Sequence, residues 1–229
     1  MAYAIIVAAG CGKRMQSPIA KQFLELGNIP ILVRTLRVFA RHPKIAGIFL
    51  VVPEKEVDFC CSRILPEVED GTDLQVVAGG ARRQDSVYQG LLAVSEPGRI
   101  VVIHDGVRPF VSPELITACI AGADRLGACI AGIPASDTVK RVGPENEIRE
   151  TLARQEIWLA QTPQAFRWEL IKEAFDKAIA AGFSGTDDAS IMEYIGRPVR
   201  MIEGSRQNIK ITTPADMELA AAFLKKQQP

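Results

Sequence analysis

Glycines and cationic side chains gather near the start of the chain, with a spacing that suits phosphate chemistry. Gly10 and Gly12 follow an apolar run at residues 4–9, and several cations, among them Arg14 and Lys21, come shortly afterwards. Glycines let backbone N–H groups approach a phosphate closely, and cations offset its negative charge. The pattern therefore predicts a polyphosphate bound where a buried strand ends. A tight turn between a strand and a helix, with its charges in solvent, is the alternative interpretation.

The spacing of this loop excludes two common nucleotide-binding motifs. The dinucleotide fingerprint needs a third glycine at the position that Met15 occupies, which disfavours a nicotinamide-dependent oxidoreductase. A Walker loop needs Ser or Thr after Gly-Lys, and here Arg14 follows. What remains resembles the start of nucleotidyltransferases that make a nucleoside-diphosphate sugar or alcohol.

A second glycine-rich stretch, residues 79–86, combines two glycines with two arginines, an aspartate and a serine. Gly80, Arg83 and Ser86 suit the binding of a nucleotide base, sugar or phosphate near the N-terminus of a helix. Because Asp and Ser are also ordinary N-cap residues, a plain helix cap is the alternative interpretation.

An acidic residue follows another apolar run. Asp105 comes directly after the strand expected over residues 99–104, three positions before Arg108. Mg²⁺ prefers oxygen and usually takes one or two carboxylates plus phosphate oxygens, so Asp105 is the candidate metal ligand. The alternative is a structural ion pair between Asp105 and Arg108. We expect His104 to be packed in the core and not to act as a catalyst.

Two later stretches carry further candidate residues. Thr186, Asp187 and Asp188 either bind a substrate or cap a short helix, and a cap alone accounts for both aspartates. Lys210 stands between two β-branched residues in a stretch, 208–212, that has the periodicity of a strand. Side chains alternate along a strand, so Lys210 is expected to face away from its neighbours, as a surface lysine in the absence of other context.

Alternating strands and helices must position these residues. Strands are expected over residues 4–9, 47–52, 74–78, 99–104, 128–133 and 199–203, and helices over 30–41, 57–65, 113–126, 168–181, 187–194 and 214–225. The strands are continuous apolar runs, which indicates an α/β fold with a doubly wound, mostly parallel sheet that helices cover on both faces. Ligands of such sheets bind outside the carboxyl ends of the strands, where the polar residues above gather.

The pattern changes after Pro134. Residues 137–142 and 148–152 flank a polar turn and predict a β-hairpin. We expect one domain over residues 1–229, with this hairpin projecting as an arm at about 136–157. An isolated hairpin is marginal in water, so the arm is expected to pack against a second subunit in a homodimer. A hairpin folded back on its own domain is the alternative.

Composition limits the class of protein. The 229 residues include 27 Lys and Arg and 27 Asp and Glu, a formal net charge of zero, which argues against bulk attraction to nucleic acid or a membrane surface. The five cysteines contain no C-x-x-C pair, which indicates reduced thiols in a cytoplasmic protein. No apolar run approaches the ~20 residues that span a bilayer, and the first residues lack the features of a signal peptide.

Several strings together resemble one family, the 2-C-methyl-D-erythritol 4-phosphate cytidylyltransferases of the non-mevalonate isoprenoid pathway. The matching strings are A-A-G-C-G-K-R-M, G-G-A-R-R-Q-D-S-V, H-D-G-V-R-P, D-T-V-K, T-P-Q, T-D-D-A-S and E-G-S-R-Q-N-I-K-I-T-T-P-A-D. They stand in the family's order from residue 4 to residue 216, and the ordered set is far more specific than any one string. The resemblance implies a Rossmann-like nucleotidyltransferase fold, Mg²⁺ as cofactor, and CTP and a polyol phosphate as substrates.

The resemblance also implies roles for individual residues. Arg14 and Lys21 match the pair that stabilises charge on the α-phosphate, while Arg154 and Lys210 match the pair that positions the acceptor phosphate. In the family, one of the latter two comes from the arm of the neighbouring subunit. The residues that match substrate contacts are Ala8, Ala9, Gly10, Gly12, Gly80, Arg83, Ser86, Asp105, Arg108, Thr138 and Thr186. Asp105 also matches an acidic position near the magnesium-bound phosphates.

The implied reaction transfers the cytidylyl group of CTP to 2-C-methyl-D-erythritol 4-phosphate and releases pyrophosphate. A phosphate-monoester oxygen is already anionic near neutral pH, so its in-line attack on the α-phosphorus needs positioning and charge stabilisation more than a general base. A ribitol-5-phosphate cytidylyltransferase is the alternative, and it would differ around Arg154, Thr186 and Lys210. A non-catalytic nucleotide-binding module is disfavoured, because simple CTP binding does not need Arg154 and Lys210.

Overall fold

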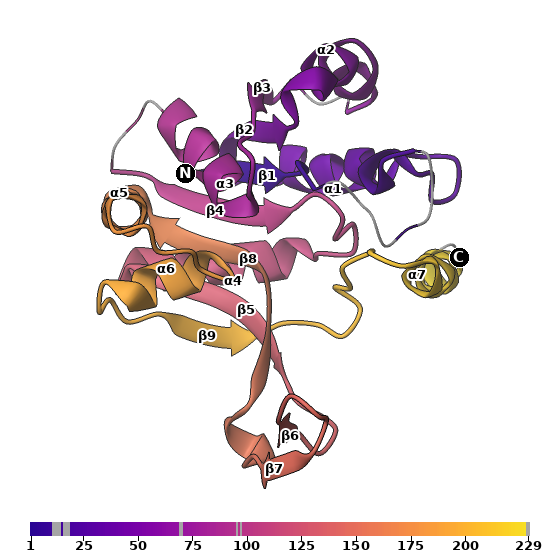
Figure 1. Cartoon of the computed structure of the whole chain (residues 1–229). Helices are drawn as coiled ribbons and strands as arrows, with labels where there is room; N and C mark the ends of the chain where they lie inside the picture. The colour runs from indigo at the N-terminus through magenta and orange to yellow at the C-terminus, as the bar shows by residue number, and fades with distance from the viewer. Residues whose placement is uncertain (11–14, 16–18, 69–70, 95, 97, 228–229) are drawn as a thin grey trace.

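The computed structural model describes residues 1–10, 15, 19–68, 71–94, 96 and 98–227 (Figure 1). They form a seven-stranded sheet with helices packed against it and a separate two-stranded sheet. The predicted α/β fold with a mostly parallel sheet is confirmed. Two predicted site residues, Gly12 and Arg14, lie outside the described residues.

The helices and strands follow the predicted order closely. The strands are β1 (Ala2–Val7), β2 (Ile45–Val52), β3 (Asp73–Ala78), β4 (Ile100–Asp105), β5 (Ala128–Pro134), β6 (Lys140–Val142), β7 (Ile148–Thr151), β8 (Trp158–Arg167) and β9 (Arg200–Glu203). The helices are α1 (Ile31–Ala40), α2 (Val57–Phe59), α3 (Arg83–Ala93), α4 (Pro113–Leu126), α5 (Trp168–Ala180), α6 (Asp188–Tyr194) and α7 (Pro214–Gln227). Where a helix is expected over 57–65, the structure has one α-helical turn, α2. A π-helical turn (Cys60–Ile64) and a 3-10 turn (Leu65–Glu67) continue it. None of the helices in the described residues has the length and apolarity needed to cross a membrane.

The strand order of the large sheet is β3-β2-β1-β4-β8-β5-β9. β1 runs parallel to both of its neighbours, β2 and β4. Val7 at the end of β1 is level with Asp105 at the end of β4, and β2 ends beside them. The chain segments that leave these strands therefore meet at one edge of the sheet, which is the edge where ligands of parallel sheets bind.

β1 is buried on both of its faces, which accounts for its continuous apolar sequence. Ile6 packs in one cluster with side chains of α1 and α4, whereas Ile5 packs on the opposite face with side chains of α3 and α5. Both side chains are fully buried, and each such burial contributes about 1.5–3 kcal/mol to stability. A rigid central strand therefore carries the glycine loop that follows it.

α4 begins and ends at the residues that local signals predict. The side chain of Ser112 accepts a hydrogen bond from the backbone N–H of Leu115 at 3.2 Å, and Pro113 occupies the first turn. Gly127 adopts a φ of 91°, a conformation that side chains disfavour, and ends the helix.

β8 is the main difference from the sequence-based expectation, which leaves residues 158–167 without a strand. It lies antiparallel between β4 and β5 in the interior of the sheet. Pro163 argues against a strand at this place, because proline has no N–H to donate to a neighbouring strand. The pairing of β8 with β5 is interrupted between Ala160 and Gln164, so Pro163 falls where the ladder does not require that bond.

The stretch at 208–212 is not the strand that its periodicity predicts. It is a loop whose Ile211 is buried, and the N–H of Ile211 donates to the carbonyl of Val107 at 3.0 Å. α7 follows it and packs in a small cluster with Ile31 of α1. This backbone bond holds Lys210 beside the loop that follows β4, although the two segments are far apart in the sequence.

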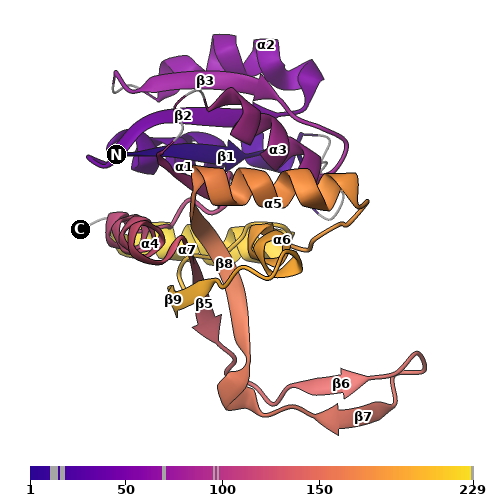
Figure 2. The same cartoon turned by 90° about the vertical axis from the view of Figure 1, so that its left-hand side faces the viewer.

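The predicted β-hairpin is confirmed as β6 and β7, which pair antiparallel. Residues 136–157, which we call the arm, leave the body at the ends of β5 and β8 (Figure 2). Both views show the arm projecting away from the large sheet and not folded back on it. The alternative of a hairpin packed on its own domain is therefore not what this chain forms.

Candidate functional site

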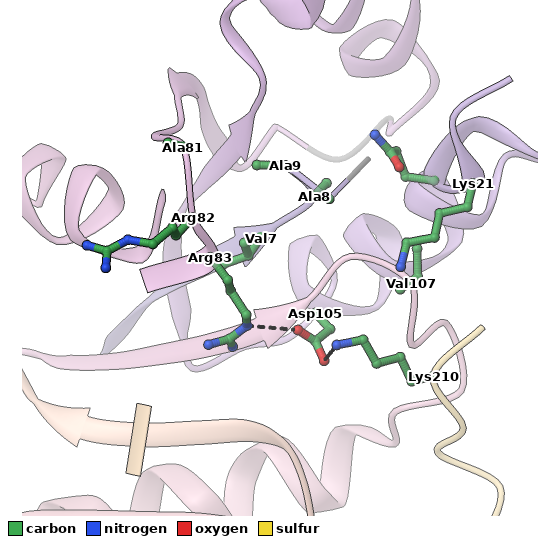
Figure 3. A pocket seen from close by; sticks show the side chains of 12 residues that line it. Val7, Ala8, Ala9, Lys21, Ala81, Arg82, Arg83, Asp105, Val107 and Lys210 are labelled. Carbon is green, nitrogen blue, oxygen red and sulfur yellow. Dashed lines mark hydrogen bonds and ion pairs between the residues drawn. The ribbon is translucent and has the colours of Figure 1, made fainter. Parts of the chain in front are cut away.

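A cavity of about 210 Å³ opens at the carboxyl ends of β1 and β4 (Figure 3). Its lining residues, which define what we call the edge pocket, are Val7, Ala8, Ala9, Gly10, Lys21, Gln22, Ala81, Arg82, Arg83, Asp105, Val107 and Lys210. The lining includes four cationic side chains and one carboxylate, a balance that favours an anionic ligand.

Asp105 is the charged centre of the edge pocket. Its carboxylate contacts three cations: Nε of Arg83 at 3.4 Å, Nε of Arg108 at 3.3 Å and Nζ of Lys210 at 3.0 Å. Burial disfavours the charge on Asp105, but the three cations outweigh burial and hold the pKa of this carboxyl below its usual range. Asp105 is therefore an anion at neutral pH that orients cationic side chains from three separate segments.

Arg83 joins two carboxylates. Besides Asp105, its guanidinium donates to Asp188 in a two-pronged contact, with Nη1 3.0 Å from Oδ1 and Nη2 2.8 Å from Oδ2. Burial disfavours the charge on Arg83, yet the two carboxylates more than offset this and raise the pKa of Arg83 above its usual value. Arg83 begins α3, and Asp188 begins α6, so this contact ties two helix starts to the pocket.

The second glycine-rich loop, at residues 79–82, is held in shape by the side chain of Ser86. The Ser86 hydroxyl is buried, accepts from the N–H of Gly80 at 3.2 Å and donates to the carbonyl of Arg82 at 3.0 Å. A Cβ added at Gly80 would lie 2.4 Å from the Cβ of Asp85, so only glycine fits there. Gly80 and Ser86 thus shape the loop that carries Arg83, and neither residue lines the edge pocket itself.

His104 is packed in the core beneath the pocket, as predicted. It is fully buried, with Nε2 3.2 Å from the carbonyl of Arg108 and Nδ1 3.0 Å from the hydroxyl of Thr162. A carbonyl only accepts, so Nε2 carries the proton and Nδ1 accepts from Thr162. Burial lowers the pKa of His104 to about 3, which keeps it neutral. The same Thr162 hydroxyl accepts from the N–H of Asp105, so this network supports the end of β4.

The structure brings most of the predicted residues of the chain body together. The predicted residues that line the edge pocket are Ala8, Ala9, Gly10, Lys21, Arg83, Asp105 and Lys210. Arg108 joins them through Asp105, and its Nη1 also donates to the carbonyl of Asn208 at 2.7 Å. Lys210 is therefore not the plain surface lysine of the default interpretation, because its ammonium contacts Asp105 in the pocket.

Gly80, Ser86 and Arg108 support the edge pocket without lining it, and three further predicted residues lie away from it. Thr138 and Arg154 are exposed on the arm, where the Arg154 guanidinium donates to the carbonyl of Ser136 at 2.7 Å. Thr186 is exposed in the turn before α6. Within this one chain, the arm residues and the pocket residues are thus separate groups.

Two residues near the site have roles that the sequence did not reveal, Gln22 and Asp188, the latter expected to bind a substrate or to cap a helix. Gln22 is buried, lines the pocket and donates to the Glu56 carboxylate at 3.1 Å. Asp188 is buried and holds Arg83, whereas Asp187 is the residue that caps α6 by accepting from the N–H of Ser190 at 2.9 Å. A signal for Asp188 was present, because two adjacent aspartates cannot both be the N-cap of one helix.

A metal ion at this site would have to use Asp105. In the part of the chain that the structure describes, no group of three or more His, Cys, Asp or Glu side chains is placed to hold a metal ion. Both oxygens of Asp105 already accept from cations. Mg²⁺ binds through one or two carboxylates plus phosphate oxygens, so these residues fit an ion that arrives with a triphosphate, with Asp105 as at most one protein ligand.

Comparison with known proteins places this chain among cytidylyltransferases. A protein of Syntrophus aciditrophicus strain SB, named 2-C-methyl-D-erythritol 4-phosphate cytidylyltransferase, is 49% identical over 225 residues, which are 98% of this chain and 96% of the relative. A protein of the same name from Geobacter metallireducens is 46% identical over 230 residues, 99% of each chain.

Solved structures agree with the sequence relatives. The crystal structure of 4-diphosphocytidyl-2C-methyl-D-erythritol synthase from Anaerococcus prevotii superposes with a TM-score of 0.86 at 34% identity, covering 98% of this chain and 96% of that one. The 2-C-methyl-D-erythritol 4-phosphate cytidylyltransferase of Thermus thermophilus gives 0.79 at 32% identity, covering 98% and 100%. The family model described as IspD, 2-C-methyl-D-erythritol 4-phosphate cytidylyltransferase, matches residues 2–226. This chain belongs to that family.

Proposed function

We propose that the protein transfers the cytidylyl group of CTP to 2-C-methyl-D-erythritol 4-phosphate, giving 4-diphosphocytidyl-2-C-methyl-D-erythritol and pyrophosphate. The observation that carries the proposal is the convergence of Lys21, Arg83 and Lys210 on one pocket at the ligand-binding edge of the sheet. Membership of the family supplies the two substrates and favours methylerythritol over ribitol as the acceptor.

The chemistry asked of these side chains is positioning and charge stabilisation. The acceptor phosphate attacks with an oxygen that is already anionic, so no general base is required. Lys21, at the start of the short turn Lys21–Phe23, and Lys210, in the 208–212 segment, both supply positive charge to the pocket. Such pre-placed cations favour the charge that develops on the α-phosphate, and they need no rearrangement at the moment of reaction. Neutral, buried His104 takes no part in proton transfer.

Magnesium is part of the same proposal. A magnesium ion carried by CTP would neutralise charge on the triphosphate and on the departing pyrophosphate. Asp105 is the residue of the edge pocket that would face it. The cations around Asp105 would otherwise repel a free divalent ion, so the nucleotide is expected to bring the metal in.

We also propose a homodimer formed through the arm. Val142 and Ile148 on the arm are 52% and 65% exposed, and Leu159 at its base is 54% exposed. A second copy of the chain would cover these apolar side chains, and the arm has too little core of its own. In that arrangement Arg154 and Thr138 would reach the pocket of the neighbouring subunit, where the family places an arm residue.

The proposed compartment is the cytoplasm. Cys60, Cys61, Cys119 and Cys129, the cysteines among the described residues, are free thiols. Free thiols are typical of a reducing compartment.

Pyrophosphate release with CTP and Mg²⁺ tests the proposed function. Parallel reactions would contain 2-C-methyl-D-erythritol 4-phosphate, ribitol 5-phosphate or neither acceptor. Release with the first acceptor alone is the expected result. Release with ribitol 5-phosphate alone would overturn the acceptor and keep the CTP site, while release with neither would overturn the proposed transfer.

A further inference from the structure

We propose that Asp188 is a positioning residue of the edge pocket, which holds Arg83 in the orientation that receives the nucleotide. The inference rests on the proposed function, because it takes the ligand of the pocket to be CTP. Asp188 itself does not line the pocket, so it would act through Arg83.

The contact between Asp188 and Arg83 is the best-defined ion pair of the site. Asp188 is 1% exposed, and both of its oxygens accept from the guanidinium, at 3.0 Å and 2.8 Å. A two-pronged contact of this kind fixes the plane of the guanidinium as well as its distance. The third nitrogen of Arg83, Nε, is then directed toward Asp105, as Figure 3 shows.

Asp188 also affects which carboxylate each cation of the site contacts. Arg83, Arg108 and Lys210 all contact Asp105, but Arg83 has the longest of the three contacts, at 3.4 Å. Its two bonds to Asp188 are shorter, at 3.0 Å and 2.8 Å, so Asp188 is the main partner of Arg83. Without them, Asp105 would be the remaining carboxylate for Arg83, and the guanidinium would move toward it and compete with Lys210.

The place of Asp188 is set by the sheet and not by a loop. Gln164 of β8 is buried; its amide donates to Asp187 at 2.8 Å and accepts from the N–H of Ala189 at 3.0 Å. These two bonds flank Asp188 on both sides of the chain. The start of α6 is therefore anchored to an interior strand, as a positioning residue requires.

Asparagine at position 188 would keep the shape of the side chain but would no longer hold Arg83 by two bonds. One of its two polar atoms is an NH₂ group, which would face a guanidinium N–H donor and could not accept from it. Asp188→Asn therefore releases one prong of Arg83 and removes the compensating charge. Asp176→Asn is the matched control, because Asp176 forms an ion pair with Lys172 on α5, and its side chain is 46% exposed.

The measurement is the dissociation constant of Mg-CTP for the full chain by titration calorimetry, without acceptor. We expect Asp188→Asn to weaken binding about tenfold, which corresponds to about 1.4 kcal/mol, and Asp176→Asn to leave it unchanged. Binding by Asp188→Asn that equals the wild type would overturn the inference and leave the proposed function intact. A wild type that does not bind CTP would overturn the proposed function itself.

A double-mutant cycle separates positioning from a general effect on the fold. If Asp188 acts through Arg83, then Arg83→Gln and the double variant Arg83→Gln/Asp188→Asn should bind CTP equally, within about twofold. A double variant clearly weaker than Arg83→Gln would show that Asp188 acts by another route and would overturn the inference. The double variant leaves neither charge of this pair unpaired, whereas Arg83→Gln alone leaves Asp188 without its partner, so thermal unfolding of each variant is measured beside its CTP binding.

Discussion

The edge pocket and the arm place charged residues in opposite environments. At the pocket, Asp105 and the neighbouring Asp188 are buried, and each is paired with Arg83 from a distant segment. On the arm, the ion pair of Arg141 and Glu150 has side chains that are 65% and 50% exposed. Buried pairs resist change because breaking one leaves an uncompensated charge, whereas exposed pairs contribute little. The pocket is thus shaped within one chain, while Arg154 on the arm is exposed and donates to the backbone carbonyl of Ser136.

Lys21→Ala tests the pocket side of this comparison and should have the largest effect. The ammonium of Lys21 would stabilise charge that develops only in the transition state, so turnover should fall by about 10²–10³-fold. CTP binding should change much less. Steady-state kinetics together with CTP titration check this, and Lys225→Ala on the exposed end of α7 is the control. Unchanged turnover in Lys21→Ala would contradict the assignment.

Arg154→Ala tests the arm side. Alone it should lower turnover strongly, because the proposed dimer lends Arg154 to the neighbouring pocket. Mixing it with Lys21→Ala and exchanging subunits should restore activity, since a mixed dimer contains one pocket with both residues. About a quarter of wild-type activity is expected in an equal mixture. A mixture as inactive as its two components would show that the arm acts within its own chain, or not at all.

Two substitutions compare an ion pair of each region directly. Arg108→Gln removes a buried contact with Asp105 and the bond to the Asn208 carbonyl, and should lower the free energy of unfolding by about 1.5–3 kcal/mol. Arg141→Gln on the arm should lower it by less than about 1 kcal/mol. Urea unfolding of both variants measures the difference. Equal losses would mean that burial does not distinguish the two regions.

Acid stability reports on the core beneath the pocket. Burial lowers the pKa of His104 from 6.5 to about 3, so the unfolded chain takes up this proton first as the pH falls. The free energy of unfolding therefore does not depend on His104 above about pH 6.5. Between pH 6.5 and pH 3 it falls as the pH falls, by at most about 1.4 kcal/mol per pH unit.

The measurement is urea unfolding of the wild type and His104→Asn between pH 7 and pH 4. The variant should show a flatter dependence of unfolding free energy on pH, because asparagine does not titrate in this range. Parallel curves for the two proteins would contradict the assignment of this slope to His104.

Much of the site was recognisable in the sequence because it follows strands. The ends of β1 and β4 were visible as apolar runs, and Lys21, Arg83 and Asp105 follow such runs closely. In a parallel sheet, neighbouring strands end at the same edge, so these residues were expected to meet, and they do. α4 was predictable to the residue, since a serine cap, a first-turn proline and a terminal glycine all act locally.

Other features depended on contacts between distant segments. No strand was expected over β8, and its place inside the sheet, with the ladder interrupted near Pro163, is set by its pairing with β5. From the sequence, Asp188 has the features of a helix cap. Its contact with Arg83, 105 residues away, exists only in the folded chain.

The sequence by itself determined the elements, their order and the type of chemistry, because periodicity, caps and turns are properties of short stretches of chain. The tertiary structure determined which charged side chains form ion pairs with each other. Lys210 contacts Asp105 because the N–H of Ile211 bonds to the carbonyl of Val107, and Arg83 is held because β8 anchors the start of α6. Ion pairs between distant residues and the burial of their side chains form only when distant segments of the chain come into contact, and no local sequence pattern contains that information.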